Sequence, residues 1–407
     1  MTDGESYGLN WVGKAAAFNS ATAKTGCRLT YDKAASRDGA STSHVFVEGD
    51  NLDVLKLLQA DFAGQVGMIY IDPPYNTGQR FTYEDRFGTH SRWLSMMAPR
   101  LVLARELLAD DGLLFVSIDE HEHRNLLLLL CEIFGEENFL GDLIWKKKSG
   151  GGSDATSFIL DHEYLPCFRK SAAASFSIDP EATVTTSYPH QDERGRYSLE
   201  RLDKQNLGYE AGLDFPIQGP DGRSYHVHHK DPSNKRARWR WSTKSVETRH
   251  SELVFRGDSV YTKNYEKKGA RPRSLLTERR FGRTRSGKHD LQALFGATML
   301  DYPKPVRLIR HLLRIASKPD SLVLDFFCGS GTTAQAVLEE NQQDGGHRRW
   351  ICVQTAEAID PESDAGKMGL KTISALAAER IRRAADSLPE PQSGEDRGFR
   401  FLRLSSP

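Results

Sequence analysis

The chain has 407 residues, of which 38% are hydrophobic and 27% charged, and its formal net charge is +0. This composition is ordinary for a globular protein with room for roughly two or three domains. No apolar run reaches the about 18 residues of a membrane span. The five scattered cysteines favour neither a disulfide framework nor a zinc site. We therefore expect a reduced, cytoplasmic protein with no membrane contact and no bound metal.

The first part of the chain alternates short apolar runs with stretches whose apolar residues recur every three or four positions. The first pattern is typical of buried strands and the second of amphipathic helices. After an irregular N-terminal arm at 1–43, the predicted elements are a strand at 44–49, a helix at 52–61, a strand at 66–71, a helix at 90–112, a strand at 112–119 and a helix at 120–135. This α/β alternation predicts a parallel sheet covered on both faces by helices.

The alternation of predicted strands and helices stops after residue 150 and resumes near residue 296. Strands at 142–147 and 162–168 are expected to complete the first half of the sheet as an antiparallel pair. The resumed elements are a helix at 303–317, a strand at 321–327, a helix at 332–341, a strand at 349–354 and a helix at 369–386. We therefore predict one α/β domain in two parts, 44–170 and 296–385, with an insertion at 171–295 and a loose tail at 386–407.

The insertion carries a local excess of positive charge. Between Lys230 and Lys288 there are 18 lysines and arginines against 6 aspartates and glutamates, so the remainder of the chain is acidic. This asymmetry is expected of a nucleic-acid-binding module. A solvated basic loop is the plainer interpretation, but aromatic residues such as Trp239 and Tyr261 interrupt the charges and disfavour simple disorder.

Two motifs follow predicted strands in the two halves of the sheet. The strand in MIYIDPPYNTG, 68–78, runs into Asp72, Pro73, Pro74 and Tyr75. A tight turn explains this, and so does a site that needs fixed hydrogen-bond acceptors beside an aromatic ring. The stretch LDFFCGSGTTAQAV, 324–337, is a strand, a glycine-rich turn and a helix. Ligands of open α/β sheets bind where the strand order reverses, so the two motifs are expected to face one crevice.

The glycine-rich turn limits the kind of cofactor. Gly329 and Gly331 allow a sharp turn and a close approach of the backbone to a ligand at a helix N-terminus. The turn has neither the third glycine of the dinucleotide fingerprint nor the lysine of a P-loop. NAD and ATP are therefore poor fits.

In this order, with an insertion between them, the motifs resemble those of the β class of S-adenosylmethionine-dependent DNA amino-methyltransferases. EGDNLDVL at 48–55, DPPYNTG, YPKPVRLI at 302–309 and FFCGSGTT are similar to the modification subunits of type III restriction systems. The resemblance implies a circularly permuted, Rossmann-like methyltransferase sheet with an inserted target-recognition region. It also implies sequence-specific methyl transfer from S-adenosylmethionine to the N6 amine of an adenine flipped out of duplex DNA.

The resemblance also assigns roles to residues of the turn after the strand at 66–71. The Asp72 carboxylate and the Pro73 carbonyl would each accept one amine N–H and turn the nitrogen lone pair toward the methyl group. Pro74 would stiffen the turn, and Tyr75 would offer a face on which the base stacks. The residues expected to bind the cofactor are Asp50, Lys304, Asp325, Phe327, Gly329, Gly331 and Glu357.

Within that cofactor set, Asp50 would lie near the adenine and Lys304 near the methionine carboxylate. A helix N-cap is an equally good interpretation of Asp50. The strand at 349–354 ends in Gln354 where many relatives have an acid, so either Gln354 or Glu357 would contact the ribose.

Several alternatives stay open at the level of sequence. Cytosine-N4 methylation uses the same chemistry, although Asp72 favours adenine. A catalytically silent DNA-binding module on the same fold is a second alternative. Double-stranded DNA is the expected partner, with a second copy of the chain and a restriction subunit as further candidates. The recognition sequence cannot be derived from the residues of 171–295 alone, because base readout depends on geometry.

Overall fold

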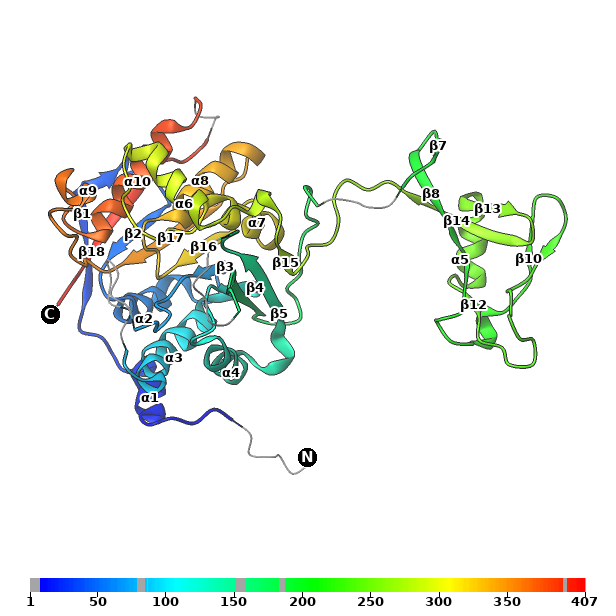
Figure 1. Cartoon of the computed structure of the whole chain (residues 1–407), viewed down its shortest axis with the longest axis horizontal. Helices are drawn as coiled ribbons and strands as arrows, with labels where there is room; N and C mark the ends of the chain where they lie inside the picture. Colours follow the sequence, from blue (N-terminus) through cyan, green and yellow to red (C-terminus); the bar gives the residue numbers. More distant parts are fainter. Residues whose placement is uncertain are drawn as a thin grey trace. The chain divides into compact units, whose positions relative to one another are not determined.

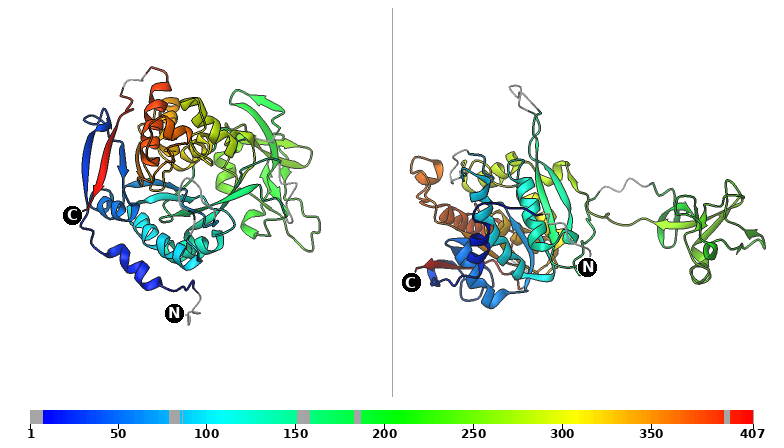
Figure 2. Two further views of the ribbon diagram at one scale, coloured as in Figure 1. Left: turned by 60° about the vertical axis from the view of Figure 1, so that its left-hand side comes forward. Right: turned by 90° about the horizontal axis from the view of Figure 1, so that it is seen from below.

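A computed structural model describes residues 8–78, 85, 87–150, 158–182, 187–390 and 394–406. The chain forms two compact units (Figures 1 and 2). The large unit comprises Met1–Asp179 and Arg271–Pro407, and the small unit comprises Pro180–Ala270. None of the helices in these described ranges is long and apolar enough to cross a membrane.

The large unit is built on a ten-stranded sheet with the order β1-β18-β2-β17-β16-β3-β4-β6-β5-β15. The strands are β1 Arg28–Arg37, β2 Val45–Glu48, β3 Val66–Ile71, β4 Leu108–Val116, β5 Phe139–Lys146, β6 His162–Arg169, β15 Leu275–Leu276, β16 Leu322–Asp325, β17 Arg349–Gln354 and β18 Phe399–Ser405. From β18 to β4 every neighbouring pair is parallel, as the predicted alternation requires. The predicted antiparallel pair is β5 and β6.

Helices cover both faces of this sheet (Figure 1). They are α1 Lys14–Thr22, α2 Asn51–Phe62, α3 His90–Leu107, α4 His123–Phe134, α6 Thr284–Phe295, α7 Val306–Ala316, α8 Thr332–Asp344, α9 Asp364–Lys367 and α10 Ile373–Ser387. Successive residues of β3 alternate between the two hydrophobic cores. Ile69 and Ile71 pack in the core that α1 to α4 share, whereas Met68 and Tyr70 pack in the core of α7, α8 and α10. This period of two explains why a buried parallel strand is apolar throughout.

The strands that carry the two motifs are neighbours. β3 and β16 pair in parallel, with Val323 opposite Met68 and Leu324 opposite Ile69. From this pair the chain proceeds outward in opposite directions, from β3 to β4 and from β16 to β17. The sheet therefore has its switch point here, and both motifs follow the carboxyl ends of the two strands. This arrangement confirms the predicted crevice.

Both ends of the chain depart from the prediction. Residues 1–43 are not an irregular arm, because they contain α1 and β1, and Trp11 of this segment donates to Ser95 Oγ of α3 at 2.9 Å. Residues 386–407 are not a loose tail, because β18 lies between β1 and β2. The sequence FRFLRLS alternates apolar and polar residues, and Phe399 and Phe401 are buried. The predicted helix at 90–112 ends at Leu107, where β4 begins.

The small unit is narrower than the insertion predicted at 171–295. β15 pairs with β5, and α6 packs near α10, so residues 271–295 belong to the large unit. The small unit has a four-stranded antiparallel sheet, β13-β14-β8-β7, and two strand pairs, β10-β11 and β12-β9. Its elements are β7 His190–Asp192, β8 Gly195–Arg201, β9 Asp203–Lys204, β10 Ile217–Gln218, β11 Ser224–Tyr225, β12 Arg238–Trp239, α5 Thr243–Thr248, β13 Leu253–Arg256 and β14 Ser259–Tyr265. Its own core is centred on Leu202, Trp239 and Val260.

Candidate active site

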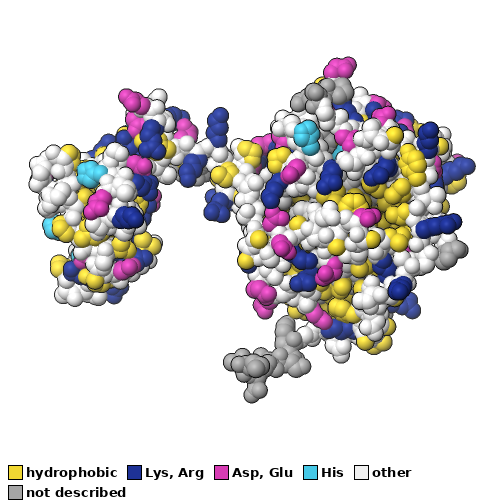
Figure 3. All heavy atoms as spheres, turned by 180° about the vertical axis from the view of Figure 1, so that it is seen from behind, with side chains coloured by type: hydrophobic (Ala, Val, Ile, Leu, Met, Phe, Trp, Pro, Cys, Tyr) yellow, Lys and Arg dark blue, Asp and Glu magenta, His cyan; other side chains and the backbone are white. Residues whose placement is uncertain are grey.

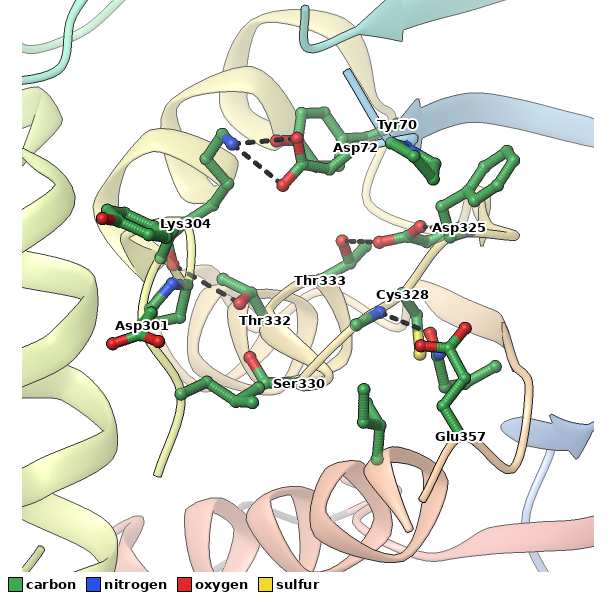
Figure 4. A pocket seen from close by; sticks show the side chains of 18 residues that line it. Tyr70, Asp72, Asp301, Lys304, Asp325, Cys328, Ser330, Thr332, Thr333 and Glu357 are labelled. Atoms are coloured by element: carbon green, nitrogen blue, oxygen red, sulfur yellow. Dashed lines mark hydrogen bonds and ion pairs between the residues drawn. The ribbon is translucent and has the colours of Figure 1, made fainter. Parts of the chain in front are cut away.

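One pocket of the large unit lies where the two motifs meet (Figure 4). Its lining combines the turn after β3, the glycine-rich turn after β16, the segment before α7 and the residues after β17. The residues concerned are Tyr70, Asp72, Pro74, Leu300, Asp301, Tyr302, Pro303, Lys304, Asp325, Phe327, Cys328, Gly329, Ser330, Thr332, Thr333, Gln354, Glu357 and Ile373. Segments separated by more than 200 residues of sequence thus form one site, as the strand order requires.

The turn after β3 is anchored on both sides. Trp93 of α3 donates its ring N–H to the Pro74 carbonyl at 2.7 Å. Asn76 adopts a left-handed conformation with φ of 61°, which is uncommon outside glycine. Its side-chain amide donates to the buried Glu122 at 2.6 Å, and its backbone N–H donates to Asp85 at 2.7 Å. Two prolines and these anchors hold the Asp72 carboxylate in a fixed position.

The Asp72 carboxylate belongs to a network of buried and partly buried polar groups. Lys304 donates from Nζ to Asp72 Oδ1 at 2.8 Å and to Oδ2 at 2.9 Å. The Tyr75 hydroxyl donates to Asp72 Oδ1 at 2.7 Å and accepts from Lys304 at 2.8 Å. Glu163 of β6 adds a second carboxylate, with Oε2 3.3 Å from the Lys304 ammonium. Figure 4 shows the lysine tip directed at Asp72.

These contacts have opposing effects on protonation. Burial raises the pKa of Asp72, and the Lys304 ammonium opposes this rise. Burial also disfavours the charge on Lys304, but Asp72 and Glu163 outweigh that effect and raise the pKa of the ammonium. Lys304 therefore stays protonated at neutral pH. An ionised aspartate is stable here because a cation lies next to it.

The glycine-rich turn presents backbone and hydroxyl groups to the pocket. Gly329 donates its N–H to the side-chain oxygen of Gln354 at 2.8 Å, and Gly331 caps α8 with φ of 83°. Asp325 accepts the Phe327 N–H at 3.1 Å and the Thr333 hydroxyl at 2.5 Å. Burial raises the pKa of Asp325 to about 7, against the lowering by these two donors.

Gln354 and Glu357, the two candidates for a ribose contact, differ in whether a side-chain oxygen is available to accept a further hydrogen bond. The Gln354 side-chain oxygen already accepts from Gly329. Glu357 Oε1 accepts the Thr355 hydroxyl at 2.8 Å, whereas its buried Oε2 has no hydrogen-bond partner in the described part of the chain. Burial raises the pKa of Glu357. A buried acceptor without a donor fits a ligand hydroxyl, so Glu357 is the better candidate.

Not every predicted site residue lines the pocket. Asp50 caps α2, accepting the Leu52 N–H at 2.8 Å, and pairs with Arg100 at 3.0 Å, so its N-cap interpretation is the one the structure supports. Pro73 and Gly331 are buried, Tyr75 is half-buried, and none of the three lines the pocket. Lys304 lines the pocket, but its ammonium is bonded to Asp72 and not directed at the glycine-rich turn.

Glu163 is the polar residue that the sequence did not single out. It lies in a predicted strand, HEYLPCF, without a motif around it. Its Oε2 accepts the Tyr75 hydroxyl at 3.1 Å, and its Oε1 lies 3.5 Å from Lys147. A charged residue in an otherwise apolar strand was the one available signal, because buried charges are rare unless they are paired.

Comparison with known proteins accounts for this arrangement. A family model described as DNA methylase matches residues 66–360, which include both motifs and the whole small unit. The chain belongs to the DNA methylase family. The Asp-Pro-Pro-Tyr turn and the glycine-rich turn both lie within the matched residues.

Among the relatives of this chain, two are named as Mod subunits of type III restriction-modification enzymes and one as a type II methyltransferase. The type III restriction-modification enzyme EcoPI Mod subunit of Escherichia phage P1 is 33% identical over 444 residues, covering 93% of this chain and 68% of that protein. The StyLTI Mod subunit of Salmonella typhimurium is 32% identical, covering 91% of this chain and 61% of that protein. The type II methyltransferase M.KpnI of Klebsiella pneumoniae is 32% identical, covering 86% and 89%. The chain thus spans less than two thirds of the Salmonella relative.

The two glycines of the glycine-rich turn, Gly329 and Gly331, should respond differently to replacement by alanine. A Cβ on Gly329 would meet no protein atom within 4 Å, and the residue lines the pocket. We expect Gly329→Ala to weaken binding of S-adenosylhomocysteine by about tenfold in calorimetry, with the cost to folding limited to the strain of a positive φ, about 1 kcal/mol.

Gly331→Ala is the matched variant for that prediction. Its Cβ would lie 3.3 Å from the Ala377 carbonyl of α10, so it should lower the melting temperature more than Gly329→Ala does. Unchanged binding in Gly329→Ala, or a loss no larger than that in Gly331→Ala, would contradict a ligand contact at Gly329.

Proposed function

We propose that this chain is a DNA methyltransferase that transfers a methyl group from S-adenosylmethionine to the N6 amine of an adenine flipped out of duplex DNA. The observation that carries the proposal is the shared pocket, in which the Asp72 carboxylate faces the glycine-rich turn. Family membership and the similarity to enzymes named as methyltransferases support it.

The residues present fit this cofactor. When bound, S-adenosylmethionine supplies a methyl group on a positively charged sulfur. Glu357 has an open acceptor for a ribose hydroxyl, and Phe327 and Gly329 border the space beside it. Asp325 holds the glycine-rich turn in shape through the Phe327 N–H and Thr333.

Asp72 and Pro73 would act on the nucleophile. An exocyclic amine is weakly nucleophilic because its lone pair is conjugated into the ring. Two fixed acceptors, the Asp72 carboxylate and the Pro73 carbonyl, would bind its two N–H groups and direct the lone pair at the methyl carbon. Ionised Asp72 would be the stronger acceptor, because hydrogen bonds to a carboxylate are stronger than those to a neutral carboxyl. Tyr75 would support the base with its ring, and its hydroxyl fixes one oxygen of Asp72 at 2.7 Å.

Cytosine-N4 methylation is the second candidate, because the same two acceptors can hold a cytosine amine. The aspartate at the first position of the motif favours adenine by resemblance. Sequencing DNA from cells that express the chain, with detection of modified bases, distinguishes the two products and gives the recognition sequence. Transfer of tritium from labelled cofactor to that duplex tests the reaction itself. No modified base and no transfer would refute the proposal.

The small unit is proposed to contact the DNA. Several of its basic side chains are engaged internally, among them Lys263, which pairs with Asp192 at 2.7 Å. Others are exposed, including Lys267 and Lys268. Figure 3 shows basic and acidic side chains interspersed over the presented face of this unit. We also propose that the chain acts in the cytoplasm. A restriction subunit and a second copy of the chain are its candidate protein partners.

Salt dependence tests this DNA contact. Each neutralised phosphate contributes a slope of about −0.9 in log affinity against log salt. Replacing Lys267 and Lys268 together with alanine should flatten the slope by up to about two units and leave the sequence preference unchanged. Lys263→Ala is the control, because its ammonium already has a partner within the small unit, and it should change the slope less. An unchanged slope in the double variant would place the DNA path elsewhere.

A further inference from the structure

The charge balance of the pocket depends on Lys304. Among the described residues that line the pocket, four carry carboxylates (Asp72, Asp301, Asp325 and Glu357) and Lys304 is the one cation. A ligand with an anionic group therefore finds a single ammonium in this wall. The Lys304 side chain is 8% exposed, and Asp72 already holds its ammonium through both carboxylate oxygens.

The hydrogen-bond capacity of Lys304 is fully used. An ammonium has three N–H donors. Lys304 directs them at both oxygens of Asp72 and at the Tyr75 hydroxyl, and Glu163 lies a further 3.3 Å away. Four acceptors thus share three donors. A further anion can bind this ammonium only by taking a donor from one of the present partners.

The backbone that carries Lys304 is fixed. Gly287 of α6 packs so closely that a Cβ there would lie 2.0 Å from the Pro303 carbonyl. The N–H of Val306 donates to Asp290 at 2.9 Å, and the Thr332 hydroxyl of α8 contacts the Lys304 carbonyl at 3.4 Å. Any change of partner must therefore come from the side-chain torsions of the lysine. Its stem starts beside the first turn of α8 and its tip lies at Asp72.

We propose that Lys304 exchanges its bond to Asp72 for a bond to the carboxylate of the cofactor's amino-acid moiety. The inference rests on the proposed function, because it requires that cofactor in this pocket. In one position Lys304 occupies both oxygens of Asp72, where the amine N–H would otherwise bind. In the other position it frees the Asp72 carboxylate for the amine. Lys304 therefore couples cofactor binding to the availability of the catalytic acceptor.

The neighbouring charges permit this exchange. Glu163 keeps a cation when Lys304 moves, since Lys147 lies 3.5 Å from its other oxygen. Asp72 keeps the Tyr75 hydroxyl as a donor at 2.7 Å. Neither carboxylate is left without a partner, which would be costly at a buried position. Glu163 and Tyr75 act here as positioning residues.

The test compares two probes by calorimetry. S-adenosylhomocysteine carries the amino-acid carboxylate and no sulfonium charge, and methylthioadenosine lacks the amino-acid moiety altogether. If Asp72 competes for Lys304, Asp72→Asn should tighten binding of S-adenosylhomocysteine by about tenfold, the usual size of one charge-assisted hydrogen bond. Binding of methylthioadenosine should change less than about twofold.

Two further variants establish that the effect acts through the lysine. Lys304→Gln should weaken S-adenosylhomocysteine by about tenfold and leave methylthioadenosine unchanged, and in its presence Asp72→Asn should give no further gain. Asp301→Asn is the matched control, because Asp301 also lines the pocket but lies 3.6 Å from Lys288 in an ion pair. It should not tighten binding.

The outcomes separate this inference from the function on which it rests. If both probes bind and Asp72→Asn affects them equally, or the gain persists without Lys304, the exchange is wrong and the cofactor proposal stands. If neither probe binds the unmodified chain, the exchange and the cofactor proposal both fail. Circular dichroism checks that each variant is folded. If Asp72→Asn does not fold, the comparison of the two probes in Lys304→Gln still decides whether the lysine binds the amino-acid carboxylate.

Discussion

Replacing Asp72 with alanine should lower the rate of methyl transfer by about 100- to 1000-fold, the usual cost of removing one strong fixed acceptor. The carboxylate lies at the pocket wall and is held by the Tyr75 hydroxyl at 2.7 Å and by Lys304 at 2.8 Å. A solvent molecule in the space left by alanine would not reproduce that fixed geometry. The measurement is tritium transfer to duplex DNA that contains the recognition sequence.

Binding experiments show whether the loss is chemical. The Asp72→Ala variant should bind S-adenosylhomocysteine at least as tightly as the unmodified chain, since the proposed competitor for Lys304 is gone. Asp53→Ala, a half-buried residue in the first turn of α2 and outside the pocket lining, serves as a control for replacing an aspartate and should transfer methyl groups normally. Activity of Asp72→Ala within about threefold of normal would contradict the two-acceptor mechanism.

The crevice could be predicted because parallel strands impose strong constraints. A buried parallel strand is a continuous apolar run, and polar residues can follow it only at its ends. The runs at 66–71 and 321–327 satisfy this pattern, and each is followed by a motif. Once both strands belong to one sheet, the position of the site follows from the switch point. The pairing of β3 with β16 confirms that inference.

The contacts inside the pocket could not be predicted in the same way. Lys304 and Asp72 are 232 positions apart, and the side chain of Lys304 has several rotatable bonds. The resemblance placed this lysine at the cofactor carboxylate, whereas the structure places its ammonium on the Asp72 carboxylate. Glu163 reaches the same point from β6, a strand whose neighbours are set by antiparallel pairing. Contacts of this kind, between side chains from distant parts of the sequence, depend on packing across strands. No local sequence pattern encodes that packing.

The edge of the sheet was missed for a different reason. β1 reads RLTYDKAASR, with few apolar residues, and its burial is partial along its length. An edge strand packs on one face at most, so its sequence differs little from that of a loop. β18 has a clearer alternation, but it is short and lies near the end of the chain, where disorder is the usual expectation.

Substitutions of Tyr75 should lower the rate of methyl transfer to different degrees, and the largest of these losses should be second only to that of Asp72→Ala. Tyr75→Ala is expected to reduce methyl transfer by about 100-fold, because it removes both a stacking face and a hydroxyl, and stacking on one base contributes about 1–3 kcal/mol. Tyr75→Phe keeps the ring and should lose about tenfold or less, the cost of one hydrogen bond. Tyr31→Ala, at an exposed position of β1, is the control and should retain activity.

The phenylalanine variant separates the two roles of Tyr75. Its hydroxyl donates to Asp72 at 2.7 Å and accepts from Lys304 at 2.8 Å, and the Lys304 ammonium lies 5.1 Å from the ring centroid. If the ring face is the main requirement, Tyr75→Trp should resemble Tyr75→Phe, and both should exceed Tyr75→Ala. Equal losses in all three would instead assign the effect to the hydroxyl. The base would then be supported by another surface, and Tyr75 would serve to position Asp72.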